Sequence, residues 1–593
     1  MRTHWKLIVL AAILGSSTLA AEDWPQFQYD SAHSGNAPSH KLTLPLGLRA
    51  AIPLTDAVYT SPAIVDGRIY ALDGSGVLFC IDASTCKTLW KFVSAGGPRN
   101  CNNVSSPAVV GGHVHFGTTA GIYYVLNARD GSVVRQIDCG EPIFSCPVVG
   151  LEAVYFATLG SRLTALSFDG QTRWTWDYVR EVLKFEGDRW SGQDWLRHLK
   201  QRVTWREQFL CSRDFAVQGK IIVLPAGGAI VWLEDGGNSA RQLGIFAPNE
   251  SPATLGLSLG PDGRAYRQWF RRDNTGRVEV LWLAKDEIQA AFVPGTETSY
   301  VGSESMGFSP VAIRDKAVYR CRPESRFGFC KHEDGKTSLL GDYPSITPPT
   351  LVGEHAVVCG LDGRLIVVPL NGEGDHWSFQ TPFGRPITAP AAAADEQLVF
   401  GGEDGYLYIL GPGGSAPLPA APLPLCEVRS QLTSTLSDDQ YNWDRHFADQ
   451  ANANRTLQGL ETPLVMRWIH RCPGTIKHLS TFGGGRVYTH TAEGLITAAE
   501  QETGRLLWRV FYPGVHVSFT TPAYHQERLY LPQAGLDTCQ LRCLDAATGA
   551  LVWETPFSGS PSWNRQLTPI IHDGLIFYQF STGRYTARNW LFE

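Results

Sequence analysis

Short apolar runs alternate with polar turns along most of the chain, and the pattern recurs about every 40 residues. The segment SPAIVDGRIYALDGSGVLFCIDASTCKTLW (Ser61 to Trp90) aligns nearly position by position with SPAVVGGHVHFGTTAGIYYVLNARDGSVV (Ser106 to Val134). Each unit holds an apolar run opened by Ser-Pro, an Asp-Gly type turn, two alternating runs, a D-A-x-T-G-like turn and a last run. This pattern predicts a four-stranded antiparallel meander.

The proline that opens each unit gives a count of the repeats. It recurs at seven places, and an eighth unit has Asp214 in its place before GKIIVLPAGGAIVWLE (219–234). The seven prolines are Pro62, Pro107, Pro147, Pro252, Pro310, Pro349 and Pro390. Proline is tolerated at a strand start that does not donate to the ladder.

The ends of this repeat array complement each other. Its last unit stops one strand short at GYLYILGPGG (405–414), while the run LGLRAAIPL (46–54) precedes the first unit without a place of its own. The leading run can therefore supply the missing outer strand and remove an exposed sheet edge. We predict an all-β fold, an eight-bladed β-propeller of four-stranded antiparallel blades over residues 22–414.

A second body is expected after a Pro-rich linker (415–440), which continues the stretch GPGGSAPLPAAPLP (411–424). WDRHFADQANANRT (443–456) echoes WPQFQYDSAHSGN (24–36), and LVMRWIHRC (464–472) echoes the closing strand. Further repeat units follow over 481–508 and 522–553, and another starts at Pro569. These signals predict a partial second propeller over 441–593, with about three blades, truncated and less stable than the first.

The N-terminus has the features of a secretory signal peptide, assigned to residues 1–20. Arg2 and Lys6 precede the apolar run Leu7 to Leu14, and small residues follow up to Ala20. No stretch approaches the roughly 20 apolar residues of a membrane span, and no cysteine stands at the cleavage point to carry a lipid anchor. We expect an exported protein, periplasmic or extracellular.

Composition changes this picture only by exclusion. The 593 residues include 60 Gly, 36 Pro and 18% charged residues, which favours short strands and tight turns over long helices. The net charge is -6, with acidic and basic residues interspersed. We therefore expect neither nucleic acid nor an anionic membrane as a partner.

The chain has 13 cysteines, and export would place them where disulfides form. Three pairs flank apparent turns or connections, and we predict disulfides between them: Cys80 with Cys86, Cys139 with Cys146, and Cys321 with Cys330. None of the cysteine spacings carries the partners of a zinc site.

One long insertion, WDYVREVLKFEGDRWSGQDWLRHLKQRVTWREQF (176–209), interrupts the repeats. Within it, SGQDWLRHLKQR has the pattern of a short helix, with Ser191 as N-cap and Asp194 three residues later. One interpretation is a lid whose aromatic and imidazole side chains meet a ligand such as a sugar face: Trp190, Trp195, His198 and Trp205. The favoured interpretation is an amphipathic surface helix that packs its apolar side on the propeller.

The opening motif W-P-x-F-x-x-D-x-x-x-S-G and turns such as DAATGALVW (545–553) resemble pyrroloquinoline-quinone (PQQ) like repeat propellers. That group includes quinoprotein alcohol dehydrogenases and the propeller lipoprotein of the outer-membrane assembly machine. The resemblance implies that the repeated tryptophans pack between neighbouring blades: Trp90, Trp174, Trp377, Trp508 and Trp553. These motifs specify a blade well and a function poorly.

A dehydrogenase of this group is expected to have two adjacent cysteines near the quinone, a Trp platform, and calcium held by Glu and Asn beside a catalytic Asp. The chain has no Cys-Cys dipeptide and no C-x-x-C-H haem motif. We therefore expect no cofactor, no catalytic residue and no metal site, and a scaffold or a module that binds an unknown protein or glycan. The alternatives are a quinoprotein oxidoreductase with PQQ and calcium, and a carbohydrate-active propeller.

Overall fold

The computed structural model describes most of the chain from residue 22 onward. The described residues are 22–95, 100–191, 194–195, 209–211, 214–247, 256–270, 275–285, 287–296, 298–299, 309–321, 328–343, 345–421, 443–445, 448–449, 459, 464–472, 474, 476, 479–492, 494–512, 520–534, 539–556 and 568–578. The expected signal peptide and most of the expected linker lie outside these ranges. No helix among the described residues is long and apolar enough to cross a membrane.

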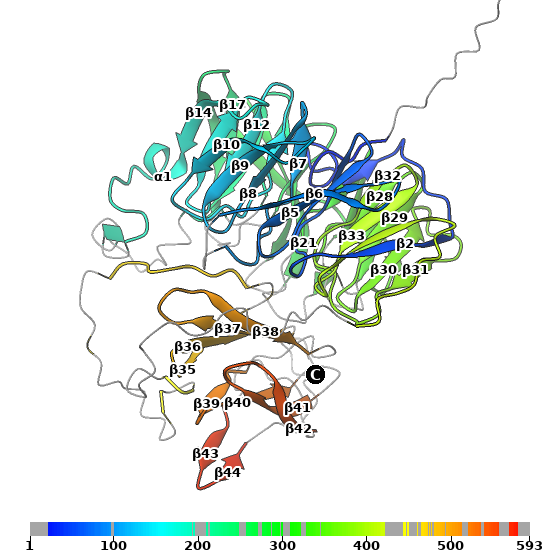
Figure 1. Cartoon of the computed structure of the whole chain (residues 1–593). Coiled ribbons are helices and arrows are strands. Elements are labelled where there is room, and N and C mark those ends of the chain that lie inside the picture. The colour runs from blue at the N-terminus through cyan, green and yellow to red at the C-terminus, as the bar shows by residue number, and fades with distance from the viewer. Residues whose placement is uncertain are drawn as a thin grey trace, which may run out of the picture.

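Eight antiparallel sheets form the described part of the chain up to Pro412 (Figure 1), each with four strands in meander order. The first four are β3 to β6 (Ala63–Val65, Arg68–Leu72, Val77–Asp82, Thr88–Val93), β7 to β10 (Ala108–Val110, His113–Gly117, Ile122–Asn127, Val133–Asp138), β11 to β14 (Val148–Val149, Val154–Ala157, Arg162–Leu166, Thr172–Asp177) and β15 to β18 (Ala216–Gln218, Ile221–Ala226, Ala229–Asp235, Ala240–Phe246). A short helix, α1 (Tyr178–Glu181), follows β14.

The next sheets are β19 to β22 (Ser258–Leu259, Ala265–Phe270, Thr275–Ala284, Glu287–Phe292), β24 to β27 (Ala312–Arg314, Ala317–Cys321, Phe329–Glu333, Lys336–Gly341) and β28 to β31 (Thr350–Val352, His355–Cys359, Arg364–Pro369, Trp377–Gln380). Short strands extend two of them, because β23 (Thr298–Ser299) pairs with β21 and β1 (Asn36–Ala37) pairs in parallel with β28. The predicted all-β fold of four-stranded antiparallel sheets is confirmed.

The eighth sheet joins the two ends of this repeat array. It has the order β2, β34, β33, β32, and β2 (Leu46–Pro53) precedes the first repeat while β32 to β34 (Ala392–Ala394, Gln397–Gly401, Tyr406–Pro412) come last. Ala51 lies opposite Tyr408, and Figure 1 shows the blue strand β2 among yellow-green strands. The leading run therefore closes the ring, as its sequence predicts. We call these eight sheets the ring.

Burial follows strand position within each sheet. In the first sheet, β4 and β5 are almost wholly buried, whereas the outer strand β6 alternates between exposed and half-buried residues. Inner strands are covered by the neighbouring sheets on both faces, so they read as continuous apolar runs, while the outer strand faces water.

Trp90 and Trp508 join neighbouring sheets, as the resemblance implies for the repeated tryptophans. A Cβ on Gly131, which has a φ of +74°, would lie 2.6 Å from the ring of Trp90 of the preceding sheet. Gly549 stands in the same relation to Trp508. Glycine is required here both by the left-handed backbone and by the close approach of the indole. Trp553 precedes the two-stranded sheet β43–β44 and is 37% exposed.

The opening segment Trp24–His40 runs along the inner edges of all eight sheets. Its polar atoms form hydrogen bonds with one residue on the innermost strand of each sheet. In chain order these residues are Ile64, Val109, Val149, Val217, Leu259, Ile313, Leu351 and Ala393. Trp24 is fully buried and bridges to Ile64. The opening segment as a whole therefore ties the eight sheets together at the centre of the ring.

The same contacts and the strand register correct the position of the opening residue by five residues in the unit of Pro252, and by one residue in the units of Asp214, Pro310 and Pro390. Leu259 bonds to the opening segment as Ile64 does, which gives Leu257 the position that Pro62 has in the first sheet. Pro252, taken from the sequence as the opening residue, lies upstream and outside the described residues.

The described residues after the linker form three further sheets. They are β35 to β38 (Thr481–Gly483, Arg486–His490, Leu495–Glu500, Leu506–Phe511), β39 to β42 (Ala523–His525, Arg528–Ala534, Cys539–Asp545, Leu551–Pro556) and the pair β43 and β44 (Ile570–His572, Leu575–Phe577). We call them the second body. Residues 464–472, expected to form a closing strand, belong to no strand, and no described sheet is placed to receive them.

Candidate functional site

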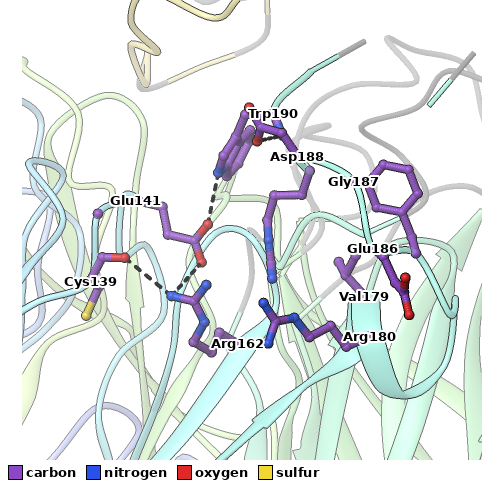
Figure 2. A pocket seen from close by; sticks show the side chains of 12 residues that line it. Cys139, Glu141, Arg162, Val179, Arg180, Glu186, Gly187, Asp188 and Trp190 are labelled. Atoms are coloured by element: carbon purple, nitrogen blue, oxygen red, sulfur yellow. Dashed lines mark hydrogen bonds and ion pairs between the residues drawn. The ribbon is translucent and has the colours of Figure 1, made fainter. Parts of the chain in front are cut away.

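The insertion after β14 borders a cavity of about 260 Å³ beside the third sheet (Figure 2). Its floor comes from the connection between β10 and β11 and from β13, and its side comes from α1 and the residues that follow. The lining residues are Cys139, Gly140, Glu141, Arg162, Val179, Arg180, Phe185, Glu186, Gly187, Asp188, Arg189 and Trp190.

Glu141 is the buried carboxylate of this cavity, with 4% of its side chain exposed. It accepts hydrogen bonds from Thr158 Oγ1 and from Trp190 Nε1, the latter at 3.0 Å, and Arg162 Nη1 lies 3.9 Å from its Oε1. Figure 2 shows the indole and the guanidinium on either side of it. Gly160 makes room for the carboxylate, because a Cβ there would lie 2.3 Å from Glu141 Oε2.

Asp177 anchors the opposite wall. Its side chain accepts from Val179 N and Arg180 N and so caps α1, as acidic N-caps do. It also accepts from Arg189 Nη2, and Arg162 Nε lies 3.8 Å away. Arg189 Nη1 donates to Gly160 O at 2.5 Å. Because each buried charge here has a partner of opposite sign, the buried charges of the wall are balanced.

Arg180, Glu186 and Cys139 differ from this paired set, and Glu186 is an exposed carboxylate with no ion-pair partner among the described residues. The exposed Arg180 has no ion-pair partner within the described ranges, so its guanidinium is available at the rim. Cys139 is protonated, because burial, together with the nearby Glu141, raises the pKa of its thiol to about 12. A thiol held in this form is a poor nucleophile.

The structure divides the four residues proposed for the lid. Trp190 lines the cavity and is held by Glu141. Trp195 is only 1% exposed and is stacked on Phe185 with ring centroids 3.9 Å apart, so it is a core residue and not a ligand contact. His198 and Trp205 lie outside the described residues.

The start of the expected helix has the predicted N-cap. Asp194 and Trp195 are helical, and Asp194 N donates to Ser191 Oγ at 3.3 Å. The Asp194 carboxylate accepts from Asp188 N instead of completing a capping box.

All six cysteines expected in disulfides are free thiols, which corrects that prediction. Cys330 lies opposite Arg320, so Cys321 is one residue out of register and its side chain points to the other face of the sheet. Cys80 is buried in β5 whereas Cys86 is in the following turn with a φ of 56°. Cys146 Sγ accepts from Ser106 N on the neighbouring connection, and Cys139 lies at the cavity.

A second polar cluster lies where the second body contacts the ring. Asp56, Tyr59 and Asn102 come from the connections that precede β3 and β7, and Arg509 of β38 enters between them. We call these three ring residues the Arg509 site. Asn102 also contacts His470 Nε2 at 2.9 Å. No group of three or more potential metal ligands occurs among the residues that the structure describes.

Sequence reasoning missed Glu141, Arg162 and the Arg509 site. Glu141 and Trp190 are 49 positions apart, and Asp56 and Arg509 are 453 apart. No local motif marks such pairs. The only available signal in the sequence is that Glu141 precedes the third sheet, which the insertion follows.

The sheet order, the ring closure and the Trp-to-Gly contacts define a repeat β-propeller. Its repeats are of the PQQ-like type: the model of the family described as "Outer membrane protein assembly factor BamB" matches residues 48–143 and 464–590. The two matched segments begin near the ring's closing strand and at the corresponding position of the second body.

Curated relatives match only part of the chain. Outer membrane protein assembly factor BamB of Yersinia pestis is 29% identical over 134 residues, which cover 21% of this chain and 34% of that protein. Polyvinylalcohol dehydrogenase of Pseudomonas sp is 25% identical over 181 residues, 29% of this chain and 27% of that enzyme. The chain thus matches about a third or less of the length of these relatives.

A solved structure supports the fold. The quinohemoprotein alcohol dehydrogenase ADHIIG from Pseudomonas putida HK5 superposes with a TM-score of 0.50 and 14% identity, over 70% of this chain and 84% of that one. At this identity the likeness concerns the fold alone.

Proposed function

We propose that this chain is an exported, non-catalytic propeller scaffold that recognises a polypeptide ligand at the cavity beside the third sheet. The observation that carries the proposal is the internal pairing of the cavity's buried charged groups. Glu141 is held by Thr158 and Trp190, and Asp177 is held by Arg189. A general acid or base must be free to exchange protons with a substrate, whereas fixed polar groups around an open cavity suit recognition.

The rim supplies contacts for a ligand. Trp190 offers an indole edge fixed by its bond to Glu141, and Arg180 offers a guanidinium on α1. Rigid aromatic side chains and arginines are the residues that contribute most at protein interfaces. The name of the assembly-factor relative is consistent with a protein ligand, and export is consistent with the outer-membrane setting in that name.

Site-specific photo-crosslinking tests this proposal. A photoreactive amino acid at Arg180 in the full chain should give one discrete protein adduct in the native cell envelope. The substitution Trp190→Ala should abolish that adduct while leaving the fold intact by circular dichroism. The same crosslinker at Arg241, on the outer strand β18, is the matched control and should give none. Equal adducts at both positions, or an adduct that survives Trp190→Ala, would refute recognition at the cavity.

Because a curated relative and a solved structure with a similar fold are dehydrogenases, the competing proposal is that this chain binds a quinone and acts as an oxidoreductase. The described residues do not fit such a group well: the carboxylate and amide that lie together, Asp56 and Asn102, are both bonded to Arg509. The sequence also lacks the adjacent cysteines that the resemblance implies. Adding PQQ and calcium to the full chain should give no absorption band of a bound quinone after gel filtration. A retained band would overturn the non-catalytic assignment.

A further inference from the structure

The guanidinium of Arg509 lies within the Arg509 site and is bonded to all three of its residues. Its Nη1 donates to Tyr59 Oη at 2.7 Å and to Asn102 Oδ1 at 2.9 Å, and its Nη2 donates to Asp56 Oδ1. The guanidinium carbon lies 5.4 Å from the centre of the Tyr59 ring. Asp56 is fully buried and Arg509 is 4% exposed. Carboxylate, phenol and amide oxygens thus surround one planar cation, which is the arrangement that guanidinium recognition uses.

The ring residues of this site are held independently of Arg509. Asp56 Oδ1 accepts from Ala57 N at 2.7 Å. Tyr59 is largely buried and contacts the turn at Gly74. Asn102 Nδ2 donates to Arg471 O at 2.8 Å, which turns its amide oxygen toward the guanidinium. The acceptors of Asp56 and Tyr59 are therefore oriented by the ring itself, whereas the amide of Asn102 is oriented by the segment 464–472 after the linker.

The strand that carries Arg509 is buried where its equivalents are exposed. The residue after the repeated tryptophan is Lys91 in β6, Arg509 in β38 and Glu554 in β42, and the three have equivalent register. Lys91 and Glu554 face solvent. An outer strand is normally half exposed, so the burial of β38 results from its contact with the ring.

A second acidic side chain lies near the Arg509 site. Glu403, on the turn between β33 and β34, is buried close enough to Arg509, Arg385 and Arg471 to interact electrostatically with all three. Arg385 Nη1 also donates to Phe511 O of β38 at 3.0 Å. The acidic side chains Asp56 and Glu403 thus lie near one arginine of the ring, Arg385, and near two arginines that follow the linker, Arg471 and Arg509.

We propose that the Arg509 site is a guanidinium-binding site of the ring, which the second body fills with its own arginine and which accepts an arginine side chain of another protein when β38 leaves. The ligand class is an arginine presented on an extended polypeptide. The inference concerns a different site from the cavity and stands whether or not the cavity binds a ligand.

The test compares full-length variants that bind a fluorescent, terminally blocked peptide with one arginine between glycines. Arg509→Ala empties the site, and Lys91→Ala is the matched control on an exposed, equivalent position. Arg509→Ala should bind the arginine peptide at least about tenfold more tightly than the wild type, because truncating one partner of a buried charge pair leaves the other unsatisfied. Lys91→Ala should match the wild type. Adding Asp56→Asn to Arg509→Ala should abolish the gain.

Peptide chemistry and docking are checked separately. The peptide with lysine in place of arginine should bind less tightly, and equal binding would overturn guanidinium specificity. Cys101 Sγ contacts His470 at 3.3 Å under the second body, so its alkylation rate reports whether β38 is docked. If Arg509→Ala accelerates Cys101 alkylation but gains no affinity for the arginine peptide, the contact is only an internal latch and the proposal fails.

Discussion

At the scale of single residues, burial shifts the pKa of some side chains more than the neighbouring charged groups do. Glu403 is an example: burial raises the pKa of its carboxyl to about 7, although the Thr388 hydroxyl and three arginines act in the opposite direction. His470, also buried beside Arg509, has a pKa lowered to about 4 and is neutral. Arg509 is therefore paired with Asp56, and the neutral His470 adds no further positive charge to the contact.

Glu403 gives the chain a specific dependence on pH. Because the folded state binds the Glu403 proton more tightly than the unfolded chain, its contribution to stability is complete below about pH 4.5 and is lost as the pH rises through 7. Glu403→Gln imitates the protonated form. Its free energy of unfolding, relative to wild type, should therefore be on the order of 3 kcal/mol more favourable at pH 8 than at pH 4.5.

Urea unfolding of both proteins at the two pH values measures this difference. Glu373→Gln, an exposed carboxylate, is the control and should show no such change. A Glu403→Gln difference that is the same at both pH values would contradict the assigned pKa.

The chemistry of single residues was the least predictable from sequence. The cysteine pairs were inferred from spacing along the chain, but register put Cys321 and Cys330 on opposite faces of one sheet. Trp195 was grouped with Trp190 because they are close in sequence, yet one is core and the other lines a cavity. A one-residue shift reverses the direction of a side chain, and sequence spacing does not fix it.

At the scale of elements, the opening segment makes hydrogen bonds to the sheets as a strand does, although most of it is not a strand. Trp24–His40 bonds to an inner strand of every sheet, while only Asn36–Ala37 forms a named strand within it. Its side chains are packed accordingly: the Trp24 indole lies 5.0 Å from Tyr29 between ring centroids. The echo in the second body keeps the bridge of Trp443 to Phe482, but Trp443 is only partly buried.

Removing the two tryptophans should therefore have unequal effects. Trp24→Ala should destabilise the ring by about 3 to 5 kcal/mol, the usual cost of deleting a fully buried aromatic side chain. Trp443→Ala is the matched control from the same motif and should cost clearly less. Chemical unfolding followed by circular dichroism compares them, and equal losses would contradict the central role of the opening segment.

The elements themselves could be predicted because their signals are local and repeated. The strands could be predicted from glycine-containing turns, alternating runs and the Trp after the D-A-x-T-G-like turn. The closing strand could be predicted from the run 46–54, which had no place in any other unit. The same reasoning failed at residues 464–472, which have the pattern of β2 but no strand partner among the described residues. A strand pattern becomes a strand only when a sheet is present to pair with it.

At the scale of the whole molecule, the ring and the second body differ in how their sheets are covered. Every sheet of the ring has a neighbour on both sides, whereas β43–β44 has two strands and exposes Leu575 and Phe577. The outer strand β42 is exposed along its length. Fewer buried contacts imply a lower free energy of local opening.

Hydrogen exchange followed by mass spectrometry should show this gradient. Amides of β43 and β44 should exchange first, those of β40 and β41 later, and those of β4 and β5 last. Strands β36 and β37, which lie in the sheet docked on the ring, are the internal control and should be better protected than β40 and β41. Uniform protection across both bodies would contradict the predicted difference.

The pairing of β2 with β34 has a consequence for biosynthesis. The earliest part of the ring to be translated has its partners among the last, so no native ring forms before the residues up to Pro412 are available. Contacts at such long sequence separation form slowly, because the chain loses much conformational entropy before the contacts can stabilise it. A nascent copy must therefore wait with unpaired strand edges, which leaves it prone to aggregation until the last sheet of the ring has been made.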